Sequence, residues 1–164
     1  MGKRVIEKAD FYLRRGDRKR LRRLLRKRRY AEPVTSWLVY RAVWQHTRMV
    51  PFLLADGIHP DCHLHPGDGT PLMSAAAQGA IEAMRLLLDH GADPNARNER
   101  NELPLGFACS YDQWEAAKLL VERGADVNGI EAPGMTHLDY LRNEEGIRVL
   151  RSLGGKRFSE LDQG

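Results

Sequence analysis

The segment from His59 to His65 holds the side chains best suited to metal chemistry: three histidines, a cysteine and an aspartate within seven residues. Imidazole and thiolate are common zinc ligands, so a metal-dependent enzyme is one hypothesis for this chain. Its four ligands would be His59, Cys62, His63 and His65. No second CxxC or HxxxH completes a recognised zinc spacing, however, so we predict no metal site and expect a polar loop tip that contacts a partner.

A cationic stretch precedes this segment, because eleven of the sixteen residues from Arg14 to Arg29 are Lys or Arg. As a helix, it would turn Leu21, Leu24 and Leu25 toward a core. The opposite, basic surface would consist of Arg18, Lys19, Arg22, Arg23, Arg26, Lys27 and Arg29. This surface has three interpretations: a solvated outer helix, a contact for an acidic protein partner, or a salt-sensitive contact for nucleic acid or anionic lipid. No aromatic residue interrupts the run, which weakens a single-strand-binding interpretation.

Aromatic side chains recur at helical spacing after the basic run. Trp37, Tyr40 and Trp44 stand at i, i+3 and i+7, and Tyr111 and Trp114 follow near a later turn. Two interpretations are open. Spacing of this kind is typical of core filling, whereas exposed Trp and Tyr side chains along a groove would be binding hot spots.

The remaining composition excludes several classes of protein. Residues 1–35 hold 14 Lys and Arg against 4 Asp and Glu, a net +10, and residues 36–164 hold 12 against 18, a net −6. No run of about 18 apolar residues is present, so we expect no membrane insertion, no signal peptide and a cytoplasmic location.

Two cysteines give no disulfide framework, and Cys109 is expected to be a buried small hydrophobe. The common catalytic motifs do not occur, so we predict neither an enzyme nor a cofactor.

A unit of 33 residues is repeated in the part of the chain that follows the basic and histidine-rich segments. The stretch GTPLMSAAAQGAIEAMRLLLDHGADPNARNERN spans residues 69–101, and its GADPN recurs 33 residues later as GADVN at 124–128. One helix of the unit is expected to begin at Thr70-Pro71, an N-cap hydroxyl followed by proline. A second, Ile81–Leu88, is expected to be closed by Gly91. A fixed period of this length indicates a solenoid of stacked helix pairs.

The pattern TPL, AA, G, LL and GADxN in residues 69–101 and 102–134 resembles the ankyrin repeat. The resemblance implies an all-α solenoid of antiparallel helix pairs, with hairpin-like loops to one side and partners bound on the concave side and loop tips. It also implies a scaffold without catalysis. On this alignment Ala42 and Val43 match packing positions, so Tyr40 and Trp44 take positions that edge the groove.

We expect about five helix pairs in a single domain of residues 1–156. The units are a basic N-terminal cap at 3–35, a divergent repeat at 36–68, repeats at 69–101 and 102–134, and a shortened C-terminal cap at 135–156. The first unit breaks at Gly16-Asp17 and keeps no TPL, whereas the last keeps an apolar face around Leu150. Residues 157–164 are expected to be a frayed tail.

The expected function is protein binding by a monomeric domain, with the basic first unit steering an acidic partner into place. Because no second domain is expected, an inhibitor or an immunity protein of the antitoxin type is the sharpest hypothesis. Nucleic-acid or anionic-surface binding by the arginine-rich helix is the alternative. The predicted partner-binding residues are Trp37, Tyr40, Trp44, Asp68, Met73, Gln78, Arg97, Glu99, Arg100, Tyr111 and Trp114.

Overall fold

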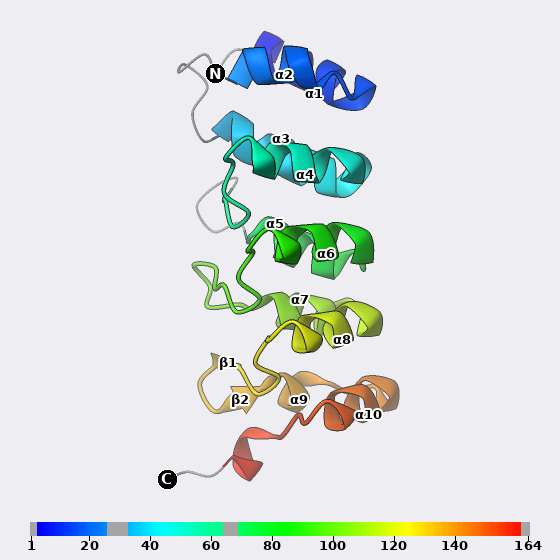
Figure 1. The fold of residues 1–164 in the computed structure, drawn as a ribbon. Helices are drawn as coiled ribbons and strands as arrows, with labels where there is room; N and C mark the ends of the chain where they lie inside the picture. Colours follow the sequence, from blue (N-terminus) through cyan, green and yellow to red (C-terminus); the bar gives the residue numbers. More distant parts are fainter. Residues whose placement is uncertain (1–2, 26–32, 64–68, 162–164) are drawn as a thin grey trace.

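Short helices follow one another in pairs, and Figure 1 shows these pairs stacked in sequence order between the two termini. The computed structural model describes residues 3–25, 33–63 and 69–161. The described helices are α1 (Lys3–Arg15), α2 (Arg18–Leu25), α3 (Pro33–Gln45), α4 (Val50–Ala55), α5 (Pro71–Ala77), α6 (Ile81–Asp89), α7 (Pro104–Ser110), α8 (Trp114–Glu122), α9 (His137–Tyr140) and α10 (Glu144–Ser152). The other elements are the 3-10 turns η2 (Thr47–Met49) and η3 (Phe158–Glu160) and the strands β1 (Ile130–Ala132) and β2 (Met135–Thr136). None of the described helices is long and apolar enough to cross a membrane.

Helices begin and end where the sequence places capping residues. Thr70 is extended, with φ −81° and ψ 164°, and its hydroxyl accepts a hydrogen bond from the Met73 amide at 3.3 Å. Pro71 follows as the first residue of α5. Gly91 lies just beyond α6 with a φ of +87°, a conformation that glycine adopts without steric conflict. The expected start and end of this helix pair are therefore confirmed.

The apolar side chains buried between neighbouring pairs form one continuous core. The first helices of successive pairs contact one another from α1 through α9, and the second helices do so from α4 through α10. Both layers supply leucines that are at most 1% exposed: Leu13, Leu38, Leu53, Leu72, Leu87, Leu105, Leu120, Leu138 and Leu150. Because each pair buries its apolar faces against its neighbours, stability depends on stacking and not on any pair alone.

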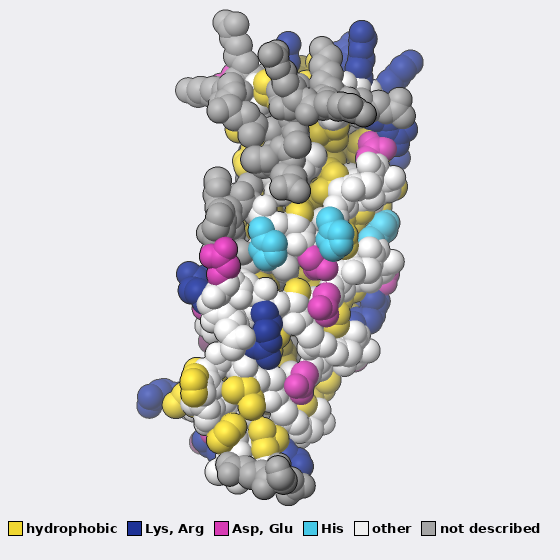
Figure 2. Space-filling model, turned by 90° about the vertical axis from the view of Figure 1, so that its left-hand side faces the viewer, with side chains coloured by type: hydrophobic (Ala, Val, Ile, Leu, Met, Phe, Trp, Pro, Cys, Tyr) yellow, Lys and Arg dark blue, Asp and Glu magenta, His cyan; other side chains and the backbone are white. Residues whose placement is uncertain are grey.

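The described parts of the connections between pairs lie on one side of the stack, at the left of Figure 1, and this side faces the viewer in Figure 2. The connection that precedes α9 forms a small antiparallel sheet in which Ile130 pairs with Thr136 and Ala132 with Met135. Gly134 permits its turn with a φ of +74°. The fold is therefore mostly helical, as the prediction of an all-α repeat fold requires, with short strands that the prediction did not include.

The C-terminal segment is packed against the last two helices. Both terminal nitrogens of Arg151 donate to the carboxylate of Glu160, at 2.5 and 2.7 Å. The Phe158 amide donates to Asp139 Oδ2 at 2.9 Å. Residues 157–161 are therefore not frayed, because their partners in α9 and α10 add to the local hydrogen bond from the Arg157 amide to Glu160 Oε2 at 2.8 Å.

Candidate functional site

A hollow of about 750 Å³ runs along the first helices of three successive pairs, α3, α5 and α7. We call it the aromatic hollow. It is lined by Trp37, Tyr40, Arg41, Trp44, Gly69, Thr70, Met73, Ser74, Ala77, Gln78, Arg100, Phe107 and Tyr111. Helix α5 packs against both α3 and α7, so three separate parts of the sequence contribute to one surface.

Helix α3 turns its aromatic side chains toward the hollow because its other face is used for the core. Ala42 and Val43 are buried, as the alignment predicted, and this leaves Trp44 with 59% of its surface exposed. The indole N–H of Trp44 donates to Ser74 Oγ of α5 at 2.8 Å, which orients the ring. The Tyr40 hydroxyl donates to the Gly69 carbonyl. Trp44 is thus an exposed, held side chain and does not fill the core.

The opposite part of the hollow is also aromatic. Tyr111, at the end of α7, is 60% exposed, and Phe107 of the same helix is half-buried. Gln78 donates from Nε2 to the Ser74 carbonyl at 2.9 Å, so its amide is fixed at the rim. The small Ala77 of α5 leaves room between the two aromatic sides. The arrangement offers apolar ring surface together with a few fixed polar groups, as binding sites for proteins usually do.

Two arginines at the rim of the hollow already have carboxylate partners. Arg41 Nε lies 2.9 Å from Asp10 Oδ1, and Arg100 Nε lies 3.0 Å from Glu102 Oε2. Burial opposes ionisation of Glu102, but hydrogen bonds from Asn98 and Arg100 outweigh it and lower the pKa of this carboxyl. The rim charges are therefore positioned before any partner arrives.

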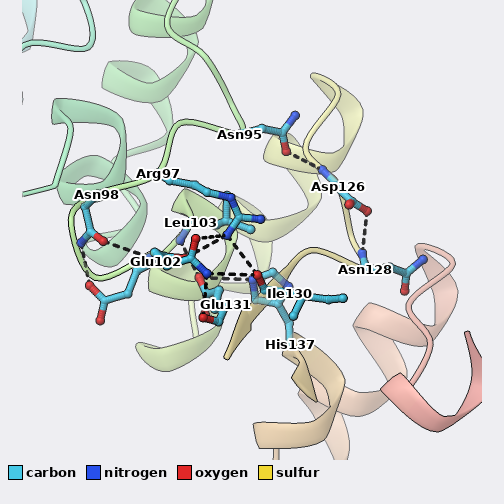
Figure 3. Close-up of polar contacts among 11 residues, drawn as sticks. Asn95, Arg97, Asn98, Glu102, Leu103, Asp126, Asn128, Ile130, Glu131 and His137 are labelled. Atoms are coloured by element: carbon cyan, nitrogen blue, oxygen red, sulfur yellow. Dashed lines mark hydrogen bonds and ion pairs between the residues drawn. The ribbon is translucent and has the colours of Figure 1, made fainter. Parts of the chain in front are cut away.

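The loop between α6 and α7 is braced against the following loop, as Figure 3 shows. Arg97 Nη1 donates to the Ile130 carbonyl at 3.0 Å, and the Leu103 amide donates to Glu131 Oε1 at 2.5 Å. Asn101 adds a bond from Nδ2 to the Glu131 carbonyl at 2.8 Å. Arg97, which was predicted to bind a partner, therefore joins two loops within the chain, while Glu99 is exposed.

A second set of hydrogen bonds connects the turns that follow the second helices of successive pairs. The side chains that make these bonds are Asp61, Asn95 and Asn128, and we call them the polar ladder. Asn95 Oδ1 accepts from the Asp126 amide at 2.8 Å, and its Nδ2 donates to the Gly124 carbonyl at 2.9 Å. Asn128 Oδ1 accepts from the Lys156 amide at 2.7 Å. The sequence analysis did not predict this ladder, although the recurrence of the asparagine in GADxN was an available signal.

Asp61 takes the place in its turn that Asn95 and Asn128 take in theirs, so it has a carboxylate where they have an amide. Its carboxylate accepts from the Asp93 amide at 3.1 Å. Burial raises the pKa of Asp61, and the bond from Asp93 opposes this rise. A carboxylate cannot donate a hydrogen bond to a carbonyl as the amide of Asn95 does, so Asp61 only accepts hydrogen bonds here.

Two predicted contact residues lie elsewhere than the alignment suggested. Met73 is 1% exposed, and its sulfur accepts from the Thr70 amide at 3.3 Å, so it forms the floor of the hollow and offers little contact area. Trp114 is half-buried in α8, and its ring lies against Gly146 of α10, where a Cβ would approach it to 2.4 Å. Met73 therefore offers little area to a partner and Trp114 lies apart from the hollow, while a partner contact at either residue stays a prediction. Asp68 lies outside the described residues.

The histidine-rich segment is only partly described, since His65 lies outside the described residues. Among those that are described, no group of three or more His, Cys, Asp or Glu side chains is placed to hold a metal ion. Asp61 belongs to the polar ladder, and burial raises the pKa of the Cys62 thiol. Cys109 is buried as expected, and burial raises the pKa of its thiol to about 12.

The predicted basic surface is exposed in its described part. Arg18, Lys19, Arg22 and Arg23 lie on α2, and Arg26, Lys27 and Arg29 lie outside the described residues. Arg22 Nη2 lies 2.5 Å from Asp56 Oδ1, and its guanidinium stands 5.2 Å from the centre of the Phe52 ring. Part of the cationic character of α2 is therefore used to join it to α4.

Stacked helix pairs, a hollow that crosses three of them and interlocked loops define a repeat protein of the interaction type. Residues 38–131, more than half of the chain, match the family described as ankyrin repeats (3 copies), and the chain belongs to this family. The resemblance drawn from the sequence is confirmed. Ankyrin repeats are generally interaction modules without catalysis.

Several plant proteins share the repeat segment. The probable E3 ubiquitin-protein ligase XBOS33 of Oryza sativa subsp. japonica is 33% identical over 88 residues, 53% of this chain and 17% of that protein. The probable E3 ubiquitin-protein ligase XBOS32 of the same plant is 46% identical over 48 residues, 29% of this chain and 10% of that protein. The E3 ubiquitin-protein ligase XBAT33 of Arabidopsis thaliana has the same identity over 48 residues, and 9% of its length is covered. The chain thus spans a small part of each curated relative.

Proposed function

We propose that the aromatic hollow binds a protein partner without catalysis, and that Trp44 and Tyr111 anchor it. The observation that carries this proposal is the exposure of these two rings, 59% and 60%, on the two sides of one hollow. Large aromatic side chains of this kind dominate the energetics of protein interfaces. The bond from Trp44 to Ser74 reduces the entropy that the indole would lose on binding.

The array that carries the hollow has five helix pairs in this proposal. The pairs α1–α2 and α9–α10 are its two caps, which is supported by the packing of α1 on α3 and of α9 on α7 at either end of the matched residues. The chain covers 17% or less of each plant ligase, so only the similarity of the repeat segment supports this proposal. Ubiquitin transfer is not part of it.

The output of binding is inhibition of the partner, as in an immunity protein, by a single chain that covers the surface the partner needs. The cationic α2 favours a partner with an acidic surface, because charge complementarity accelerates encounter. An adaptor would hold its partner in an active state. Adding the purified chain to the partner's own activity assay separates these outcomes, since an inhibitor lowers that activity in proportion to occupancy.

The binding step is tested with matched variants of the tagged full chain. The double variant Trp44→Ala, Tyr111→Ala should lose its partner, with affinity at least about tenfold lower. Tyr140→Ala is the control, because Tyr140 is 40% exposed and lies outside the aromatic hollow. Circular dichroism establishes that each variant is folded. If the double variant and Tyr140→Ala bind the captured partner equally well, the hollow is not the site.

A further inference from the structure

A second, cationic pocket of about 550 Å³ opens where the turn between α1 and α2 meets the turn between α3 and η2. These turns lie at the right of Figure 1, on the side away from the loops. We call it the arginine pocket. Its polar lining comes mainly from Arg14, Arg15, Arg18, Gln45, His46 and Arg48. No carboxylate is among the described residues that line it.

Two guanidinium groups of this pocket, those of Arg14 and Arg15, are held in place, and the charge of the pocket is only partly neutralised. Arg14 Nε lies 2.5 Å from Asp10 Oδ2, and the same carboxylate also serves Arg41 at 2.9 Å. Arg15 stands over the Phe11 ring at 4.4 Å, a contact that orients the cation and leaves its charge in place. One carboxylate thus faces several guanidiniums, and their mutual repulsion is relieved when an anion enters.

The arginine pocket and the aromatic hollow are lined by consecutive residues at the end of α3. Trp44 lines the hollow, and the next two residues, Gln45 and His46, line the pocket. Asp10 makes a second link, because it bridges Arg41 at the rim of the hollow and Arg14 in the pocket. The two sites are therefore joined through the end of α3 and through Asp10.

We infer that the partner's bound segment carries a cluster of Asp or Glu side chains next to its apolar anchor, and that these carboxylates bind in the arginine pocket. The inference rests on the proposed function of the hollow. Guanidinium forks suit carboxylates through paired hydrogen bonds. A single-stranded nucleic acid fits less well, because it needs an extended row of cations with rings for its bases, and this pocket is compact.

The pocket is tested by fluorescence anisotropy on the full chain with a labelled hexaglutamate peptide. The triple variant Arg15→Gln, Arg18→Gln, Arg48→Gln should bind this peptide about tenfold more weakly than the original chain. The matched control is Lys19→Gln, Arg20→Gln, Arg23→Gln, which removes the same charge from exposed positions of α2 outside the pocket. It should lose about twofold, through long-range attraction alone. Equal losses in both triples would mean a diffuse charge effect and overturn the inference.

Two further probes complete the test. A labelled 12-nucleotide single strand should bind more weakly than hexaglutamate at about 150 mM salt, and tighter binding that depends on the pocket triple would make the ligand a nucleic acid. The partner captured through the hollow should be released by the pocket triple and retained by the control triple. Retention by both would show that the pocket is not used with the hollow. Trp44→Ala should leave hexaglutamate binding unchanged, so failure of the hollow and failure of the pocket are distinguished.

Discussion

The junction of the first two helix pairs and the junctions that follow it are held by different interactions. Between the first two pairs, Asp10 binds Arg41 at 2.9 Å and Arg22 binds Asp56 at 2.5 Å. Further along the chain, an ion pair joins Arg123 to Asp89 at 2.8 Å, and the polar ladder adds hydrogen bonds to backbone amides, such as Asp126 N–H to Asn95 Oδ1 at 2.8 Å. Exposed ion pairs weaken with salt, whereas hydrogen bonds to backbone change little.

This difference has a consequence for function. The asparagines of the repeated motif brace the turns that follow the second helices. Among the described residues, the basic first pair has guanidiniums, such as those of Arg15 and Arg18, that make no ion pair, so this end of the stack attracts an anionic partner. Aromatic side chains in the hollow and unbalanced charge on the neighbouring pair suit a partner that is both apolar and acidic.

The largest effect is expected from the core. Leu120→Ala in α8 should lower the free energy of unfolding by about 2–5 kcal/mol, because the side chain is fully buried between neighbouring pairs. Leu21→Ala in α2 should instead loosen α1 and α2 and leave the rest folded, since this pair has neighbours on one side only. Urea denaturation followed by circular dichroism, with hydrogen exchange to locate the change, checks both. A single shared transition in Leu21→Ala would contradict the comparison.

The polar ladder should give the next effect. Asn95→Ala removes a donor to Gly124 and an acceptor for Asp126, so the free energy of unfolding should fall by about 1–2 kcal/mol. Asn95→Asp is the matched control, because it keeps the acceptor and loses the donor, as Asp61 does naturally. It should lose about half as much. Urea denaturation measures the free energy of unfolding of both variants. An equal loss in the two would contradict this prediction, because the hydrogen bond donated to Gly124 would then account for the whole contribution of Asn95.

The ion pairs of the first junction should contribute less and depend on salt. Asp10→Asn removes the contacts to Arg14 and Arg41 and should cost about 0.5–1 kcal/mol at low ionic strength. At about 1 M NaCl this difference should largely disappear, while that of Asn95→Ala should persist. Denaturant titrations of both variants at the two salt concentrations measure it. A salt-independent loss in Asp10→Asn would remove the distinction between the junctions.

The smallest effect should be seen at the C-terminal segment in acid. Hydrogen bonding from Arg151 lowers the pKa of Glu160 from 4.5 to about 2. A carboxyl with a lowered pKa stabilises the folded state above its unfolded value, so this contribution is complete above pH 4.5 and disappears as pH falls toward 2. Hydrogen exchange of η3 across this range should show its release. Glu160→Gln should show no such change between these pH values.

Much of the helical scaffold was predictable because its signals are local. The 33-residue period, the Thr70-Pro71 start and Gly91 act within a few residues, so they determine where α5 and α6 begin and end. The roles of Met73 and Trp114 were not predictable in this way. Met73 folds back onto the amide of Thr70, and Trp114 finds room only because a glycine lies opposite it in α10.

By itself, the sequence determined the repeat, the residues that begin and end its helices, its buried leucines and the concentration of positive charge near the N-terminus. Only the tertiary structure decided that Trp44 and Tyr111 border one hollow, that Asp10 serves two arginines, and that Asp61 and Asn95 brace the turns that follow them. The reason is physical: hydrophobic period and capping depend on neighbours along the chain, whereas most of these contacts join residues of different helix pairs and exist only once the pairs have stacked.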